Sequence, residues 1–164
     1  SLATLLHRLQ YPSERGPFPQ DVLALRVLER KPDVVTLFIR MTRTKIVTVT
    51  YDTEHLVTYR HHGAERASSR SVATKIVEID APDGTGGPTK PSGSDRGFMW
   101  RLNAYWRYEQ VSGGVIVELE SMTLSRAVPF GLTAIVRPII DRIARESIGR
   151  TLDGIRQIYG AAAP

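Results

Sequence analysis

The feature that most constrains this chain is one long helical repeat near its C-terminal end. Apolar and small residues recur there at intervals of three and four, the spacing of a single helix face, and predict a helix over residues 131–159. The residues expected on its buried face are Val136, Ile139, Ile140, Ile143, Ser147, Thr151, Gly154 and Ile158. Small or polar residues occupy the middle of this face, so the helix either packs very closely on its neighbour or borders a hollow.

Upstream of the helix, the chain has the period of two that is typical of β-strands, and turn residues divide it into segments. The predicted strands are residues 22–30, 34–51, 56–62, 67–80, 98–110 and 115–125. The predicted turns are residues 31–33, 52–54, 62–65 and 112–114. Because residues 40–45 interrupt the second segment, it is either one long bent strand or two strands end to end with a bulge between them.

Two further segments complete the predicted architecture. Residues 1–10 predict a short helix, with four leucines on one face, and the Gly- and Pro-rich residues 81–97 predict a mobile loop between two strands. The 164 residues suit one domain. The expected fold class is α+β: an antiparallel sheet of about six strands, spanning residues 22–125, curved around the long C-terminal helix.

Charge and composition narrow the classes of partner and compartment. The net charge is +5, but basic residues alternate with acidic ones and no nucleic-acid motif occurs, so we expect no nucleic-acid partner. No apolar run approaches 18 residues, so we expect no membrane span. No signal peptide is visible, and the start at Ser1 without a methionine leads us to expect a trimmed N-terminus. Without cysteine, both cytoplasm and periplasm remain open.

The strand at residues 98–110 and its return strand form a hairpin whose two faces differ. A turn at Ser112-Gly113 would place Arg107 near Glu118 and Tyr105 near Glu120, which is the cross-strand pairing of an exposed face. The opposite face is then expected to point toward the helix, and it carries Phe98, Trp100, Leu102, Ala104, Trp106 and Tyr108. On the return strand this inner face continues beyond Leu119 as Ser121, Thr123 and Ser125.

Sheet and helix thus both place small hydroxyl residues where bulky ones would fill a core. This coincidence predicts a ligand cavity between them, because binding cavities are mostly apolar with a few placed polar groups. The residues predicted to line it are Tyr59, Trp100, Trp106, Ser121, Thr123, Phe130, Ile143, Ser147 and Thr151. The alternative interpretation is that the hydroxyl groups bond to neighbouring backbone and that the core is solid.

Catalytic and metal-binding motifs do not occur in the sequence. His7, His55, His61 and His62 lack the spacing of metal ligands, and there is no nucleophile elbow, phosphate-binding loop or dinucleotide fingerprint. Glu118 and Glu120 fit an ion-pair ladder on the exposed face. We therefore expect no metal and no cofactor, and nothing in the sequence requires an enzyme.

The segment from Phe98 to Arg107, the Gly113-Gly114 hairpin and the long terminal helix together resemble the START-like or SRPBCC superfamily. Residues 119–126 and 144–147 are similar to a bacterial branch of it. The resemblance covers nearly the whole chain and implies the helix-grip fold of polyketide cyclases, lipid-transfer START domains and the major birch-pollen allergen. The first strand of that family has no counterpart here. We expect the resulting free sheet edge to invite pairing with a second copy, as a homodimer.

The resemblance implies that a hydrophobic, lipid-like small molecule is bound or transported in the cavity. A second hypothesis is a polyketide cyclase or aromatase-like enzyme acting on a hydrophobic substrate in the same cavity, with Arg, Tyr or His polarising it. A third is an interaction module without a ligand. A cavity between sheet and helix would favour the first two hypotheses over the third. Titratable groups turned into that cavity would favour the enzyme over the binding protein.

Overall fold

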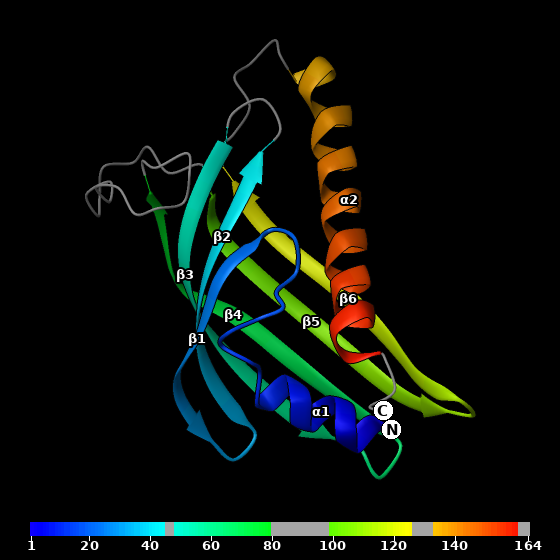
Figure 1. The fold of residues 1–164 in the computed structure, drawn as a ribbon. Coiled ribbons are helices and arrows are strands. Elements are labelled where there is room, and N and C mark those ends of the chain that lie inside the picture. The colour runs from blue at the N-terminus through cyan, green and yellow to red at the C-terminus, as the bar shows by residue number, and fades with distance from the viewer. Residues whose placement is uncertain (45–47, 80–98, 126–132, 161–164) are drawn as a thin grey trace.

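The computed structural model describes residues 1–44, 48–79, 99–125 and 133–160 (Figure 1). The described part of the chain is an α+β structure in which a six-stranded antiparallel sheet, in the order β1–β6, lies between two helices in sequence. The elements are α1 (Leu2–Gln10), β1 (Val22–Lys31), β2 (Val34–Thr44), β3 (Thr48–His61), β4 (Arg66–Ile79), β5 (Met99–Val111), β6 (Gly114–Ser125) and α2 (Thr133–Tyr159). The predicted mobile loop at 81–97 lies outside the described residues.

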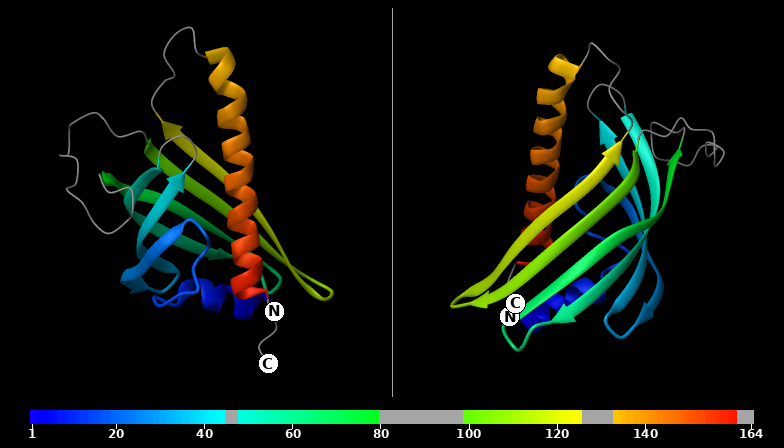
Figure 2. Two further views of the ribbon diagram at one scale, coloured as in Figure 1. Left: turned by 45° about the horizontal axis from the view of Figure 1, so that its top comes forward. Right: turned by 180° about the vertical axis from the view of Figure 1, so that it is seen from behind.

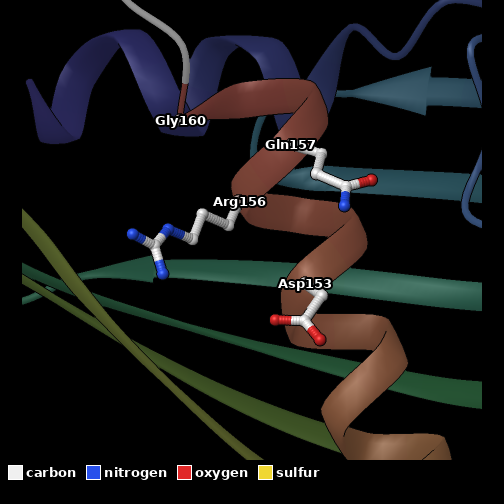
Figure 3. Close-up of a pocket in the computed structure, with 4 residues that line it drawn as sticks. All are labelled: Asp153, Arg156, Gln157 and Gly160. Atoms are coloured by element: carbon white, nitrogen blue, oxygen red, sulfur yellow. The ribbon is translucent and has the colours of Figure 1, made fainter.

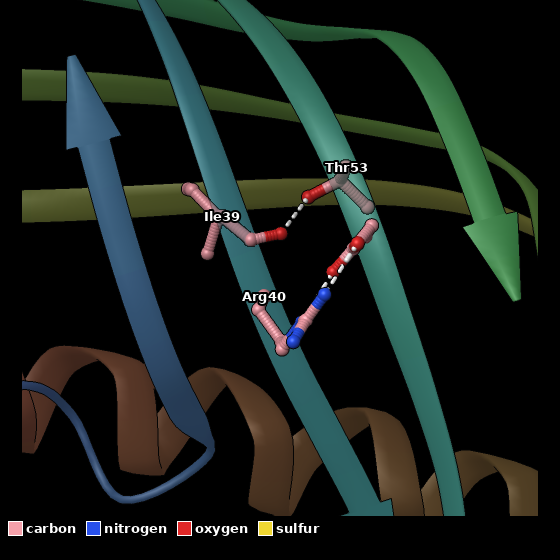
Figure 4. Close-up of polar contacts among 4 residues, drawn as sticks. Ile39, Arg40 and Thr53 are labelled. Carbon is pink, nitrogen blue, oxygen red and sulfur yellow. Dashed lines mark hydrogen bonds and ion pairs between the residues drawn. The ribbon is translucent and has the colours of Figure 1, made fainter. Parts of the chain in front are cut away.

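The prediction for residues 34–62 is wrong in two respects. The segment 34–51 is neither one strand nor two end to end, because β2 and β3 form an antiparallel pair with Thr44 opposite Thr48. The predicted turn at 52–54 lies in the middle of β3. Asp52 faces Arg40 across the ladder and receives two hydrogen bonds from its guanidinium, Nε to Oδ1 at 2.7 Å and Nη2 to Oδ2 at 2.8 Å (Figure 4). This two-pronged pairing outweighs the turn preference of the local sequence.

The other turns and the hairpin register are confirmed. Asp33 and Gly63 adopt φ angles of 56° and 88° in the turns after β1 and β3, and Gly113 adopts 88° between β5 and β6. Such positive φ values favour glycine or aspartate in tight turns. Across the β5–β6 hairpin, Arg107 lies opposite Glu118, with Nη1 3.6 Å from Oε2.

The sheet is strongly curved, and both helices lie on its concave side (Figures 1 and 2). Seen from behind, neither of the two described helices lies on the convex face, and α2 passes across the concave side with its last turns near α1. The buried core lies where α1 meets the inner face, and consists of Leu2, Leu5, Leu6, Val35, Leu37, Val57, Tyr59, Ala67 and Tyr108. Leu2 is fixed there by the 2.6 Å hydrogen bond that its N–H donates to Gln110 Oε1. The predicted first helix is confirmed, and on its leucine face Leu2, Leu5 and Leu6 are buried while Leu9 is partly buried.

The segment before β1 attaches to the C-terminal half of α2. Gly154 is buried and faces Pro19 so closely that an added Cβ would lie 3.1 Å from the proline Cβ. Arg150 Nε lies 3.4 Å from Asp21 Oδ2. At Gly154, therefore, the small residue on the helix face serves very close packing.

Among the described strands, β1 and β6 form the two edges of the sheet. β1 has two register irregularities, after Val22 and after Val27, and the Val27 N–H donates a 2.7 Å hydrogen bond to Glu14 Oε1. Bulges and occupied backbone donors are known ways of protecting an edge strand. The expected pairing of this edge with a second copy stays a prediction.

Candidate functional site

A row of polar side chains crosses the inner face of β3 and β4. His55 is buried, and its two ring nitrogens contact hydroxyl groups on either side: Nε2 lies 3.0 Å from Thr53 Oγ1, and Nδ1 lies 3.1 Å from Ser71 Oγ. Thr53 is fully buried, whereas Ser71 keeps partial access to solvent. Odd-numbered residues of β3 share the inner face because a strand has a period of two. A register shift between β3 and β4 at His55 places Ser71 on the same face, within hydrogen-bonding distance of the imidazole ring.

Counting hydrogen-bond donors fixes the direction of each bond in this row. The Thr53 hydroxyl donates its only hydrogen to the carbonyl oxygen of Ile39, at 2.9 Å (Figure 4). Thr53 Oγ1 must therefore accept from His55 Nε2–H, and a neutral imidazole then accepts at Nδ1 from the Ser71 hydroxyl. Burial lowers the pKa of His55 from 6.5 to about 4, so the ring is neutral at pH 7.

A second polar group lies closer to α1. Ser69 Oγ and the Tyr108 hydroxyl are 3.0 Å apart, and both residues are buried. Burial raises the pKa of Tyr108 to about 12, and its hydrogen bond with Ser69 opposes this shift. Burial, together with the neighbouring phenols of Tyr108 and Tyr159, also raises the pKa of Tyr59. These phenols stay neutral, so they offer hydrogen bonds and no charge.

The inner face of β5 and β6 changes from buried to open along its length. Trp106 is partly buried against the core, and its partner across the ladder, Leu119, is partly exposed. One step further, Ser121 lies opposite Ala104 and is exposed, and Thr123 is also exposed. These residues share the face of Trp106, so the core ends near Leu119 and the inner face beyond it is accessible to solvent.

The remaining predicted site residues fall into different surroundings. Tyr59 is buried in the core at the α1 end. Trp100 is 66% exposed, at a register irregularity between β5 and β6. Ser147 and Thr151 are half-buried on α2, where Thr151 Oγ1 donates a 2.9 Å hydrogen bond to the Ser147 carbonyl oxygen, as the solid-core interpretation expects.

Two predicted residues cannot be placed. Phe130 and the side chain of Ile143 lie outside the described residues. The structure therefore brings Trp106, Ser121 and Thr123 onto one open face, and ligand contact by all nine residues stays a prediction.

Sequence reasoning missed His55. The predicted turn at 52–54 hid the strand alternation that places Tyr51, Thr53, His55 and Val57 on the buried face. This alternation in residues 51–57 is the sequence signal that would have predicted a buried position for His55.

Two hollows lie elsewhere on the described part of the molecule. One, of about 500 Å³, is lined by Asp153, Arg156, Gln157 and Gly160 at the end of α2. Figure 3 shows Arg156 and Gln157 extending to opposite sides of the helix, so their polar groups do not converge on one point. The other, of about 590 Å³, lies over the convex side of β4–β6 near His62 and Arg107. Neither hollow contains a predicted site residue.

Within the described ranges, no group of three or more His, Asp or Glu side chains is arranged to hold a metal ion. Among the same residues, neither helix has the length and apolar character needed to cross a bilayer. Comparison of the chain with protein-family models, with curated proteins and with solved structures finds no match. Function is therefore inferred from the inner face alone, and the START-like resemblance stays a prediction.

Proposed function

We propose that this protein binds a hydrophobic, lipid-like small molecule between α2 and the inner face of β5–β6, in an arrangement of the helix-grip type. The observation that carries the proposal is the change from buried to open along that face. Trp106 and Leu119 supply apolar surface, and Ser121 and Thr123 beyond them are exposed although they face the helix side of the sheet. Apolar walls with a few hydroxyl groups are typical of small-molecule sites.

Two contacts with the segment before β1 support this arrangement. Gly154 against Pro19 and Arg150 against Asp21 attach the C-terminal half of α2 to the β1 side of the sheet. The helix is thereby held across the concave side, opposite the open face of β6 (Figure 1). Because these contacts hold the helix in place, α2 can form one wall of a ligand site even where its side chains do not fill the space between helix and sheet.

The test uses adjacent residues on opposite faces of β6. Thr123→Phe adds bulk to the open inner face, whereas Met122→Phe adds comparable bulk to the outer face, where Met122 is 45% exposed. An environment-sensitive apolar dye is titrated into each protein. We expect the natural protein and Met122→Phe to bind it with similar affinity, and Thr123→Phe to bind at least about tenfold more weakly. Equal binding by all three would contradict the proposal, and so would no binding by any of them.

A second measurement identifies the natural ligand. Mass spectrometry of an organic extract from the purified protein should yield a hydrophobic compound that is depleted in Thr123→Phe. If no probe or extract shows binding, an interaction module without a ligand becomes the better explanation.

One observation favours the enzymatic alternative, a cyclase-like activity in the same space. His55 is a titratable group turned inward, with a serine hydroxyl donating to its Nδ1. If the pair moved protons for an enolisable polyketone substrate, His55→Gln would abolish turnover and leave dye binding intact. Absence of turnover by the natural protein with a panel of such substrates would leave the binding function as the explanation.

A further inference from the structure

The direction of the hydrogen bonds at His55 determines what Ser71 can offer a ligand. Thr53 gives its hydroxyl hydrogen to the Ile39 carbonyl, which forces His55 Nε2 to be the protonated nitrogen. Nδ1 therefore carries a lone pair, and the Ser71 hydroxyl hydrogen, 3.1 Å away, is committed to it. Ser71 has no second hydrogen to give, but its oxygen keeps lone pairs that can accept.

Ser71 is also reachable from the inner face. It lies opposite Val57 on one side and Ala104 on the other, and Ala104 lies opposite Ser121. Adjacent strands are about 5 Å apart, so these short side chains form a shallow row leading from the exposed Ser121 to Ser71. Within the part of the chain that the structure describes, the Ser71 hydroxyl has no partner other than His55.

From these two observations we infer that the ligand of the proposed site is a hydrophobic alcohol, whose hydroxyl donates a hydrogen bond to Ser71 Oγ. This inference rests on the proposed function and narrows its ligand class. An ether, an ester or an ionised carboxylate has no hydrogen to donate, and Ser71 has none to give in return. Each would leave the accepting oxygen of Ser71 without its bond when the ligand displaces water.

The binding test compares matched chains that differ only in the head group: 1-dodecanol, its methyl ether and dodecanoate, each displacing the apolar dye at pH 7. A single net hydrogen bond corresponds to roughly a three- to tenfold preference. We expect the natural protein to prefer the alcohol over the ether by that factor. Ser71→Ala should abolish the preference without weakening the binding of the ether, because the ether makes no hydrogen bond to Ser71.

Ser68→Ala is the matched control, because Ser68 is a serine on the same strand as Ser71 that lies on the outer face, where its hydroxyl is 2.8 Å from His62 Nε2. It should keep the preference for the alcohol. If alcohol and ether bind equally to the natural protein, or if dodecanoate binds best, the inference fails and the binding function stands. Loss of preference in Ser68→Ala but not in Ser71→Ala would also overturn it. If none of the three compounds displaces the dye, the proposed function and the inference fail together.

A spectroscopic test needs neither ligand nor variant. Nitrogen-15 NMR of the histidine side chains distinguishes a protonated ring nitrogen from an unprotonated one. We expect His55 to be neutral at pH 7, with the hydrogen on Nε2. A hydrogen on Nδ1 would reverse the direction of the bond to Ser71, make the serine a potential donor, and overturn the assignment of an alcohol.

Discussion

Two glycines in α2 allow one substitution to be compared in two environments. Gly149 is exposed, and an added Cβ would meet nothing within 4 Å. Gly154 is buried, and its Cβ would lie 3.1 Å from Cβ and 3.3 Å from Cγ of Pro19. Both variants, Gly149→Ala and Gly154→Ala, gain the same helix propensity, about 1 kcal/mol. Only the second must also push the proline ring aside.

The expected difference follows from these distances. Gly149→Ala should raise the free energy of unfolding by about 0.5–1 kcal/mol. Overpacking typically costs ~1–3 kcal/mol, so Gly154→Ala should be between neutral and roughly 2 kcal/mol less stable than the natural protein. For a chain of this size, 1 kcal/mol corresponds to a change of about 2–4 °C in Tm, which thermal unfolding followed by circular dichroism can resolve.

A double-mutant cycle assigns the cost to the contact. In a Pro19→Gly background, where no side chain opposes the new Cβ, Gly154→Ala should regain the stability increase seen for Gly149→Ala. If Gly154→Ala stabilises the natural protein as much as Gly149→Ala does, the helix is not held against Pro19. The docking of α2 described above would then be wrong.

Three further predictions concern the sheet. Because the pKa of His55 is lowered in the folded chain, the unfolded chain binds a proton at His55 between pH 6.5 and about 4 while the folded chain does not. The free energy of unfolding should therefore fall by up to about 3 kcal/mol as the pH drops across that interval. Urea unfolding at several pH values should show a weaker dependence of this free energy on pH for His55→Gln than for the natural protein. Asp52→Asn should lower the free energy of unfolding by about 1–2 kcal/mol, because it breaks a two-pronged, partly buried pair with Arg40. Glu118→Gln, in an exposed pair with Arg107, should change it by less than ~0.5 kcal/mol. Equal effects would contradict the role given to burial. Trp106→Ala should lower the free energy of unfolding in urea by about 2 kcal/mol. This is below the ~3–5 kcal/mol typical of a fully buried ring, because Trp106 is only partly buried. No loss of stability would place the ring outside the core.

The sequence alone predicted the α+β class, the first helix with its leucine face, and the β5–β6 hairpin with Arg107 opposite Glu118. These features depend on local periodicity and on turns formed by Gly113 and its neighbours. Such signals act over a few residues, so they can be read directly from the chain.

The path of the chain between β2 and β3 depended on a long-range interaction. The run 52–54 carries residues that are common in turns, but it lies mid-strand because β2 pairs with it on one side, with Asp52 opposite Arg40, and β4 pairs with it on the other. That error in the predicted register also concealed His55, because a residue after a turn is not expected on a buried face.

For the candidate site, the sequence identified which residues share a face, and the tertiary structure decided what each one contacts. Gly154 and Thr151 were both consistent with either close packing or a hollow; in the structure, one packs against Pro19 and the other bonds to its own helix. Ser121, with the same pattern, lies on an open face. A small or hydroxyl side chain fits close packing, a backbone hydrogen bond or a ligand site equally well, and only the position of the neighbouring segments distinguishes these cases.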